Sequence, residues 1–223
     1  MTDSAPRFTA RSAPARALKI WDISPAVDEH SEVFPGDTAY SQQLHFSLAP
    51  GCPVNVNRIT LSPHTGAHAD APMHYANGEA AIGDVDLQPY LGPCRVIHCI
   101  DCGPLVEPAH IAHALDGLPA RVLLRTTRAA SQSWTSFTAL SPATLALLAS
   151  NNIALIGIDT PSVDPATSQN LPSHHLLLKH NLRVLENLVL DDVPEGDYEL
   201  IALPLKLARA DASPVRAILR ELP

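Results

Sequence analysis

One segment, at positions 64–74, constrains the fold of this chain more than any other. It reads HTGAHADAPMH and spaces its ionisable residues as His-x3-His-x-Asp-x3-His. A proline before it, a glycine within it and a proline near its end all disfavour a helix. We therefore expect an extended segment, in which alternate residues share one face. That face would carry His64, His68 and Asp70, and Gly66 between the histidines would leave room for an ion.

The residue types in this segment predict a metal site. Imidazole and carboxylate groups are standard ligands for zinc and similar divalent ions. The chain has eleven histidines, most of which would ordinarily be surface or hydrogen-bonded core residues. Chance would seldom gather three of them with an aspartate around one glycine. His74 follows Pro72 on a turn that could return its ring to the same pocket, where a free imidazole can carry protons.

The whole chain fits one globular domain, predicted at 18–223. It has 223 residues, 46% of them hydrophobic, and we find no interior linker or repeat. A net charge of -8 argues against a nucleic-acid partner. No apolar run approaches the ~20 residues of a membrane helix. The leader at 1–17 is rich in Ala, Ser, Pro and Arg and is predicted to be a disordered tail, with a transit peptide as the alternative.

The four cysteines include a CxxC pair, Cys99 and Cys102, which can indicate a redox or zinc site. A structural zinc knuckle would need a second such pair, and the sequence has none. Buried free thiols in a reducing cytoplasm are the preferred interpretation. We therefore predict a cytoplasmic location.

Strand-like segments outnumber helical ones. Strands are predicted at 18–24, 40–48, 54–61, 94–100, 122–126, 153–158, 182–190 and 198–205, and helices at 108–115, 141–150 and 174–180, with a short helix or tail at 214–222. Ser141 before Pro142 is typical of a helix start, and Ser173 is the expected cap of the helix beginning at His174. This order predicts a mixed α/β domain with one large sheet or a barrel-like β core and helices packed outside.

A second pair of candidate ligands, His174 and Glu186, lies far along the chain. Glu186 has apolar neighbours, and a carboxylate is costly to bury unless it is paired or bound to a cation. A buried salt bridge, with Arg183 or a distant lysine, is the alternative. If the pair holds a second ion, Asp70 could bridge both ions with its two oxygens. Two ions about 3.5–4 Å apart would then share and activate one water.

Several motifs resemble those of the bacterial kynurenine formamidases, or arylformamidases, among the cyclase-like metal-dependent hydrolases. The matching segments are FPGD at 34–37, SPHTGAHADAPMHY at 62–75, SHH at 173–175, LENLVLDDVPEGDYELIALPLKL at 185–207 and DASPVRAILR at 211–220. The resemblance covers about residues 18–222, and the C-terminal run together with the first motif is specific to the formamidase branch. It implies a compact cyclase-like α/β domain of the swivelling β/β/α type, assembled as a homodimer or larger homo-oligomer.

The resemblance also implies an activity and its residues. The implied reaction is zinc-dependent hydrolysis of N-formyl-L-kynurenine to L-kynurenine and formate, in tryptophan degradation through the kynurenine pathway. Two zinc ions per subunit are implied, with His74 as the catalytic proton donor and acceptor. The implied ligands are His64, His68 and Asp70 for the first ion, and Asp70, His174 and Glu186 for the second. His175 is a competing candidate, but the spacing to Glu186 favours His174.

Phe34 stands where the family commonly has a tryptophan that contacts the substrate's aromatic ring. From the residue alone, Phe34 could be a core anchor or a ring presented to a ligand. The departure keeps an aromatic face and loses an indole NH, which bears on substrate preference.

Three other functions remain open at this point. The first is a related cyclase-like hydrolase acting on another amide or a cyclic ester. The second is a non-haem iron oxidoreductase that uses two histidines and one carboxylate. The third is a metal-stabilised binding protein with no hydrolytic activity.

Overall fold

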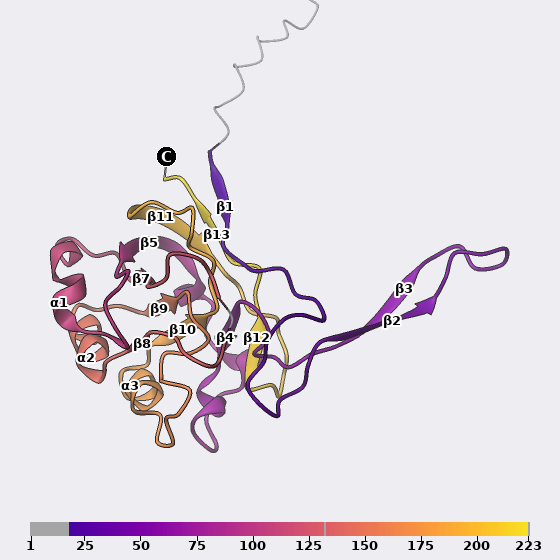
Figure 1. Cartoon of the computed structure of the whole chain (residues 1–223), viewed down its shortest axis with the longest axis horizontal. Coiled ribbons are helices and arrows are strands. Elements are labelled where there is room, and N and C mark those ends of the chain that lie inside the picture. The colour runs from indigo at the N-terminus through magenta and orange to yellow at the C-terminus, as the bar shows by residue number, and fades with distance from the viewer. Residues whose placement is uncertain (1–17, 132, 223) are drawn as a thin grey trace, which may run out of the picture.

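The computed structural model describes residues 18–131 and 133–222, so the predicted leader at 1–17 lies outside the described part of the chain. A nine-stranded mixed sheet occupies the centre and curls into a half-barrel (Figure 1). In spatial order its strands are β1 (Ile20–Asp22), β13 (Ile218–Arg220), β11 (Gly196–Ile201), β5 (Leu91–His98), β7 (Arg121–Arg125), β9 (Leu155–Ile158), β10 (Arg183–Glu186), β4 (His68–Asp70) and β12 (Ala212–Pro214). Strands β5, β7, β9 and β10 run parallel, and the outer strands pair antiparallel. The predicted mixed α/β domain with a barrel-like core is confirmed.

Alternate residues of the central strands belong to two different hydrophobic clusters, one on each face of the sheet. In β7, Leu123 belongs to one cluster, whereas Val122 and Leu124 belong to the other. The second cluster also contains Leu145 and Leu177 from the helices. Because successive side chains of a strand point to opposite faces, the helices cover one face and the curled sheet encloses the other.

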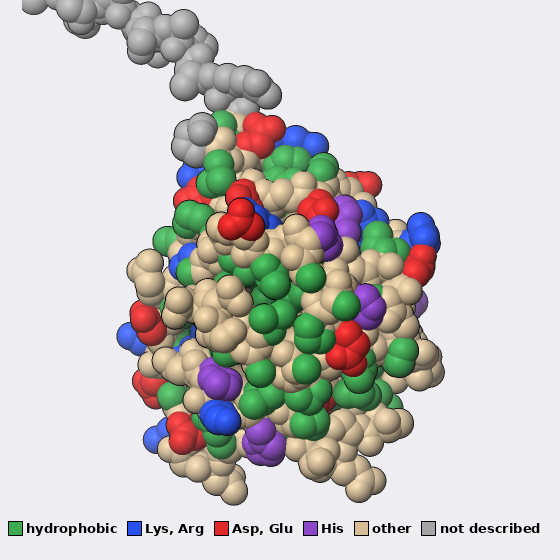
Figure 2. Space-filling view, turned by 90° about the vertical axis from the view of Figure 1, so that its left-hand side faces the viewer, with side chains coloured by type: hydrophobic (Ala, Val, Ile, Leu, Met, Phe, Trp, Pro, Cys, Tyr) green, Lys and Arg blue, Asp and Glu red, His purple; other side chains and the backbone are tan. Residues whose placement is uncertain are grey.

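Three α-helices lie on one side of the sheet: α1 (Pro108–Ile111), α2 (Pro142–Ser150) and α3 (Pro172–His180) (Figure 1). On the face seen in Figure 2, hydrophobic side chains gather at the centre and charged ones near the edge. No helix in the described part of the chain is long and apolar enough to cross a membrane.

The two predicted helix caps have different outcomes. Ser141 caps α2 as predicted, because its hydroxyl accepts a hydrogen bond from the Thr144 N–H at 3.2 Å. The predicted cap at Ser173 is wrong, since α3 begins at Pro172 and Ser173 lies inside its first turn. The carboxylate of Asp164 supplies the missing acceptor there, receiving the N–H groups of Ser173 and His174 at 3.0 Å.

The C-terminal segment also departs from the prediction. The expected short helix or tail at 214–222 is instead the end of β12, an edge strand of the main sheet, and all of β13, which lies between β1 and β11. The predicted strand at 182–190 ends earlier, at Glu186, because Asn187 has a positive φ of 57°. All four cysteines are free; two are buried, and Cys52 and Cys102 are half-buried.

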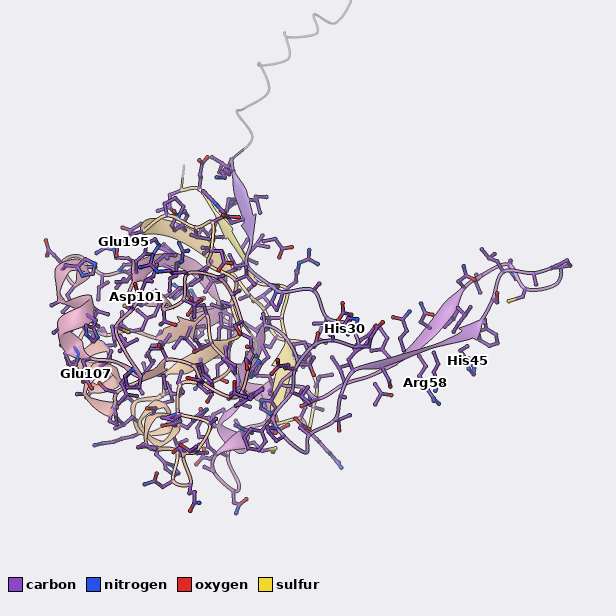
Figure 3. The ribbon with its side chains drawn as sticks, viewed as in Figure 1. His30, His45, Arg58, Asp101, Glu107 and Glu195 are labelled. Carbon is purple, nitrogen blue, oxygen red and sulfur yellow. The ribbon has the colours of Figure 1, made fainter. Side chains whose placement is uncertain are left out.

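Two small sheets complete the fold. Strands β6 (Leu105–Val106) and β8 (Ala139–Leu140) pair in parallel. Strands β2 (Ser41–Phe46) and β3 (Val56–Thr60) form an antiparallel hairpin that projects away from the body of the molecule (Figure 1). His45 and Arg58 lie on this hairpin, far from the central sheet (Figure 3). We call residues 41–60 the hairpin arm.

Candidate active site

Strand pairing brings the two predicted halves of the site together. Strand β4 lies between β10 and β12, and its register places His68 directly opposite Glu186. Directly opposed residues of an antiparallel pair point to the same face. His68 and Asp70 are two positions apart on β4, so they share that face with Glu186. The result is a contact of 3.3 Å between His68 Nε2 and Glu186 Oε2.

Gly66 does not serve the purpose expected from the sequence. Only residues 68–70 form a strand, and Gly66 lies in the turn before it with a φ of +67°. A Cβ atom there would lie 2.7 Å from a side-chain carbon of Val27, not in the space between the histidines. The carbonyl of Gly66 faces His68 Nδ1 at 2.9 Å, which leaves Nε2 of that ring free to face the site. The glycine therefore allows the positive φ and the close approach of Val27, and the carbonyl of this turn orients His68.

Asp70 is the centre of the cluster. Its side chain is 1% exposed, and neither carboxylate oxygen has a hydrogen-bond partner among the described residues. Oδ1 faces His64 Nδ1 at 3.0 Å and His68 Nε2 at 3.5 Å, whereas Oδ2 faces His174 Nε2 at 3.5 Å. A buried carboxylate without aligned donors is costly, and a cation between it and the imidazoles would remove that cost. The donor set therefore fits a metal.

His174 is fixed by a second buried carboxylate. Its Nδ1 lies 2.7 Å from Asp164 Oδ2, so its Nε2 is directed at Asp70 and, at 3.7 Å, at Glu186 Oε1. That same Glu186 oxygen accepts the Val163 N–H at 2.8 Å, which holds the carboxylate in place. A carboxylate behind an imidazole is the usual arrangement around metal-binding histidines. His175, the competing candidate, is exposed.

The cluster attracts positive charge, including protons. Burial opposes the charge on His174, but Asp164 and Asp70 raise its pKa to about 10. Burial also opposes the charge on His64, yet Asp70 and Asp211 raise its pKa to about 9. The pKa of Asp70 lies well below its ordinary value, because His174 and His64 outweigh the effect of burial. A metal would therefore have to displace protons from both histidines.

His74 lies beside His64, in the short 3-10 helix Pro72–His74, with 4.3 Å between the ring centres. Its Nδ1 faces Asp211 Oδ2 at 3.2 Å. Two triplets of possible ligands have their atoms within 4.8 Å of one another: His64, Asp70 and His74, and His68, Asp70 and Glu186. The fold therefore brings together all six polar residues predicted from the sequence. His74, predicted as a proton carrier, also lies close enough to His64 and Asp70 to bind a metal with them.

A cavity of about 360 Å³ opens onto this cluster. His64, His68, His74, His174 and Glu186 line one part of it. Phe34 and Trp134 line another part, and their rings meet edge to face with centres 5.2 Å apart. Phe34 is 48% exposed and is therefore not a core anchor. Of its two interpretations, the ring presented from a loop agrees with this position.

Three residues near the site were missed from the sequence: Asp164, Asp211 and Trp134. Asp211 begins the DASPVR segment, which is one of the matching motifs, whereas Asp164 lies in the loop after β9, which no motif marks. Trp134 lies in a polar segment with no periodicity, and nothing in the sequence points to it.

The curled α/β sheet and the buried imidazole–carboxylate cluster in a cavity define the class of metal-dependent hydrolases. The comparisons with known proteins agree. A family model named Cyclase matches residues 21–165, and the chain belongs to this family. The kynurenine formamidase of Polaromonas naphthalenivorans strain CJ2 is 83% identical over 222 residues, covering both chains completely. The kynurenine formamidase of Bordetella pertussis is 65% identical over 92% of this chain and 99% of the relative.

A solved structure shares the fold. It is described as a predicted metal-dependent hydrolase from Bacillus stearothermophilus, is 27% identical and superposes with a TM-score of 0.79 over 92% of this chain and 100% of the other. The family resemblance expected from the sequence motifs is thus confirmed.

Proposed function

We propose that this chain hydrolyses the formamide of N-formyl-L-kynurenine, giving L-kynurenine and formate in the kynurenine pathway of tryptophan degradation. The observation that carries the proposal is the position of Asp70. Its two buried oxygens face separate sets of imidazoles in a cavity that also has an aromatic wall. Relatives at 83% and 65% identity that are named kynurenine formamidase support the choice of substrate.

We infer that two zinc ions bind each subunit at Asp70. Its Oδ1 faces His64 and His68 and its Oδ2 faces His174, as the predicted division requires, but His68 Nε2 of the first set also lies 3.3 Å from Glu186 Oε2 of the second. When bound, the ions would polarise the formyl oxygen and lower the pKa of a water molecule. The proposed ligands are His64, His68 and Asp70 for one ion and Asp70, His174 and Glu186 for the other.

His74 is proposed to move the proton. Water supplies the oxygen that adds to the formyl carbon, the carbon–nitrogen bond breaks, and the aryl amine leaves with an added proton. An amine is a poor leaving group as its anion, so a proton donor at the cavity is needed. His74 lines the cavity, and its Nδ1 is occupied by Asp211, which leaves Nε2 for the substrate.

The aromatic wall is proposed to bind the aryl ring. Phe34 and Trp134 come from different loops, and the backbone N–H of Trp134 donates to the Glu32 carboxylate at 3.4 Å, which ties the two loops together. A cavity of about 360 Å³ lies within the range of small-molecule sites. Trp134 thus brings an indole to the same cavity as Phe34.

The test is elemental analysis of the purified protein combined with a formylkynurenine absorbance assay, before and after chelation. We expect about two zinc ions per chain, loss of turnover on chelation and recovery when zinc is returned. Simple amides and cyclic esters, assayed in parallel, test the alternative substrates. Turnover of one of these with none of formylkynurenine would overturn the proposal.

The hairpin arm supports a homodimer. An isolated two-stranded hairpin is marginally stable in water, and every residue of β2 and β3 is exposed. Large apolar side chains are exposed along the arm, and a second copy of this chain would cover them. These are Leu44, Phe46, Leu48, Val54, Val56 and Ile59.

The free cysteines agree with the proposed cytoplasmic location.

A further inference from the structure

One carboxylate outside the predicted ligand set contacts two imidazoles of the site. Asp211 Oδ2 lies 3.1 Å from His64 Nε2 and 3.2 Å from His74 Nδ1. Asp211 is not among the described residues that line the cavity, and its contacts with the site are those it makes to these two rings. Its pKa is lowered from the ordinary value, because the two histidines outweigh its partial burial.

The backbone around Asp211 is tied to the histidine segment. The Ala71 N–H donates to the Asp211 carbonyl at 2.8 Å, and the Ile82 N–H donates to the Ala210 carbonyl at 2.9 Å. The next residue, Ala212, pairs with Asp70 in the register of β12 and β4. The sheet thus fixes the position of this carboxylate relative to both rings, although it is 137 residues from His74 in the chain.

The contact with Asp211 sets the tautomer of a neutral His74. A carboxylate only accepts hydrogen bonds, so a neutral His74 must carry its hydrogen on Nδ1, and its Nε2 then has a lone pair. His64 faces a carboxylate through each nitrogen, since Nε2 lies 3.1 Å from Asp211 and Nδ1 lies 3.0 Å from Asp70, so Asp211 alone does not set its tautomer. A metal bound at Nδ1 would leave the ring hydrogen on Nε2, where Asp211 would accept it. One oxygen therefore orients a proposed proton carrier and a proposed ligand.

We propose that Asp211 is a positioning residue for the hydrolysis. It holds His74 in the Nδ1–H tautomer, with Nε2 free to take a proton and pass it to the departing amine. The inference rests on the proposed function for its kinetic consequence, but the tautomer can be measured without any turnover.

The kinetic test uses Asp211→Ala, Asp211→Asn and His74→Ala with saturating zinc. We expect Asp211→Ala to lower kcat roughly 10- to 100-fold with KM within about twofold, the usual scale for a lost outer partner of a site histidine. Asp211→Asn keeps an acceptor oxygen and should recover most of this loss. In the His74→Ala background, Asp211→Ala should cost no more than about twofold further, because coupled residues are non-additive.

Asp197→Ala is the matched control. The Asp197 side chain is 41% exposed, against 42% for Asp211, and it is also ion-paired, with Arg95. It lies on β11, away from the cluster, and its removal should leave kcat unchanged. Zinc content is measured for every variant, so that a loss of metal through His64 is distinguished from a loss of proton transfer.

The second readout is the nitrogen-15 spectrum of the histidines in chelator-treated protein, with His74 assigned from its loss in His74→Ala. We expect the Nδ1–H pattern in the unaltered chain and in Asp211→Asn, and its loss in Asp211→Ala. An unchanged tautomer, full kcat in Asp211→Ala, or additive losses in the double variant would overturn the inference. Absence of formylkynurenine turnover in the unaltered chain would instead overturn the proposed function. The spectrum would still show whether Asp211 holds His74 in the Nδ1–H tautomer.

Discussion

Two antiparallel strand pairs of this molecule reverse the usual relation between polarity and burial. Strands β4 and β10 carry His68, Asp70 and Glu186, and these polar residues are all buried. The hairpin arm carries Leu44, Phe46 and other apolar residues, and every position of its two strands is exposed. Folding alone would favour the opposite arrangement, because burying charge is costly and burying apolar surface is favourable.

In each region, a binding partner would offset an unfavourable contribution to the free energy of folding. At β4 and β10, the costly buried carboxylates indicate a cation. At the hairpin arm, the exposed apolar surface is the basis for the proposed second copy of this chain. The variants below test whether each region needs the ligand assigned to it.

The largest effect is expected at Asp70. Asp70→Asn keeps the shape of the side chain and removes the charge shared by both proposed ions, so turnover should fall by roughly 10³-fold or more. Zinc content should fall with it. Asp159→Asn is the control, because Asp159 is equally buried but accepts hydrogen bonds from Thr126 and Thr127. Asp159→Asn should lower Tm and leave zinc content intact. Loss of zinc in Asp159→Asn with zinc retained in Asp70→Asn would contradict the assignment of Asp70 as the shared ligand.

His74→Ala should come next. We expect kcat to fall by about 10²- to 10⁴-fold, the usual contribution of a general acid or base, with zinc still bound. Elemental analysis decides between the roles of His74, since loss of an ion would make it a ligand. His175→Ala removes an exposed imidazole one residue from His174 and should be fully active.

The sequence predicted the apolar central strands of this fold better than its short C-terminal strands. Strands at 122–126 and 153–158 are apolar runs, and β7 and β9 lie there. The C-terminal strands β12 and β13 are three residues each, and β12 contains Pro214, so no local pattern marks them. Their structure comes from pairing with distant strands, which single-segment propensity does not describe.

The same limit applied to the site. The ligand candidates were predictable because imidazoles and a carboxylate clustered in one short segment. Asp211 was not, because it faces histidines that are distant in sequence. Asp164 is only ten residues from His174, but its role depends on how the loop after β9 folds against the start of α3. Gly66 was assigned to the wrong purpose, since its close approach to Val27 depends on tertiary structure.

Acidity should weaken metal binding. The pKa values of His64 and His174 are raised to about 9 and about 10, so both rings hold protons at neutral pH unless a metal displaces them. Each proposed ion uses one of these rings, so its apparent affinity should fall about tenfold for each pH unit below 9. Zinc titrations at pH 6 to 9 measure this. A pH-independent affinity would exclude the two histidines as ligands.

A smaller effect is expected at the aromatic wall. Trp134→Leu should raise KM for formylkynurenine about 2- to 10-fold with little change in kcat, the scale of one aromatic contact. Trp21→Leu is the control. The Trp21 ring meets the Tyr198 ring edge to face, with 5.1 Å between the ring centres, and it does not line the cavity. That variant should lower stability and leave KM unchanged. An unchanged KM in Trp134→Leu would remove the indole from the substrate site.

The smallest effect on chemistry is expected at the hairpin arm. Leu44→Gln combined with Phe46→Gln removes apolar surface that no other part of the described chain covers, so subunit stability should change by only about 0.5 kcal/mol and turnover by about twofold at most. The measured mass in solution should nevertheless fall from two subunits to one. Leu87→Gln, an equally exposed position outside the arm, should remain dimeric. A dimer that survives the arm substitutions would mean that its apolar residues have another partner, whereas a monomer without activity would mean that the buried site depends on the exposed one.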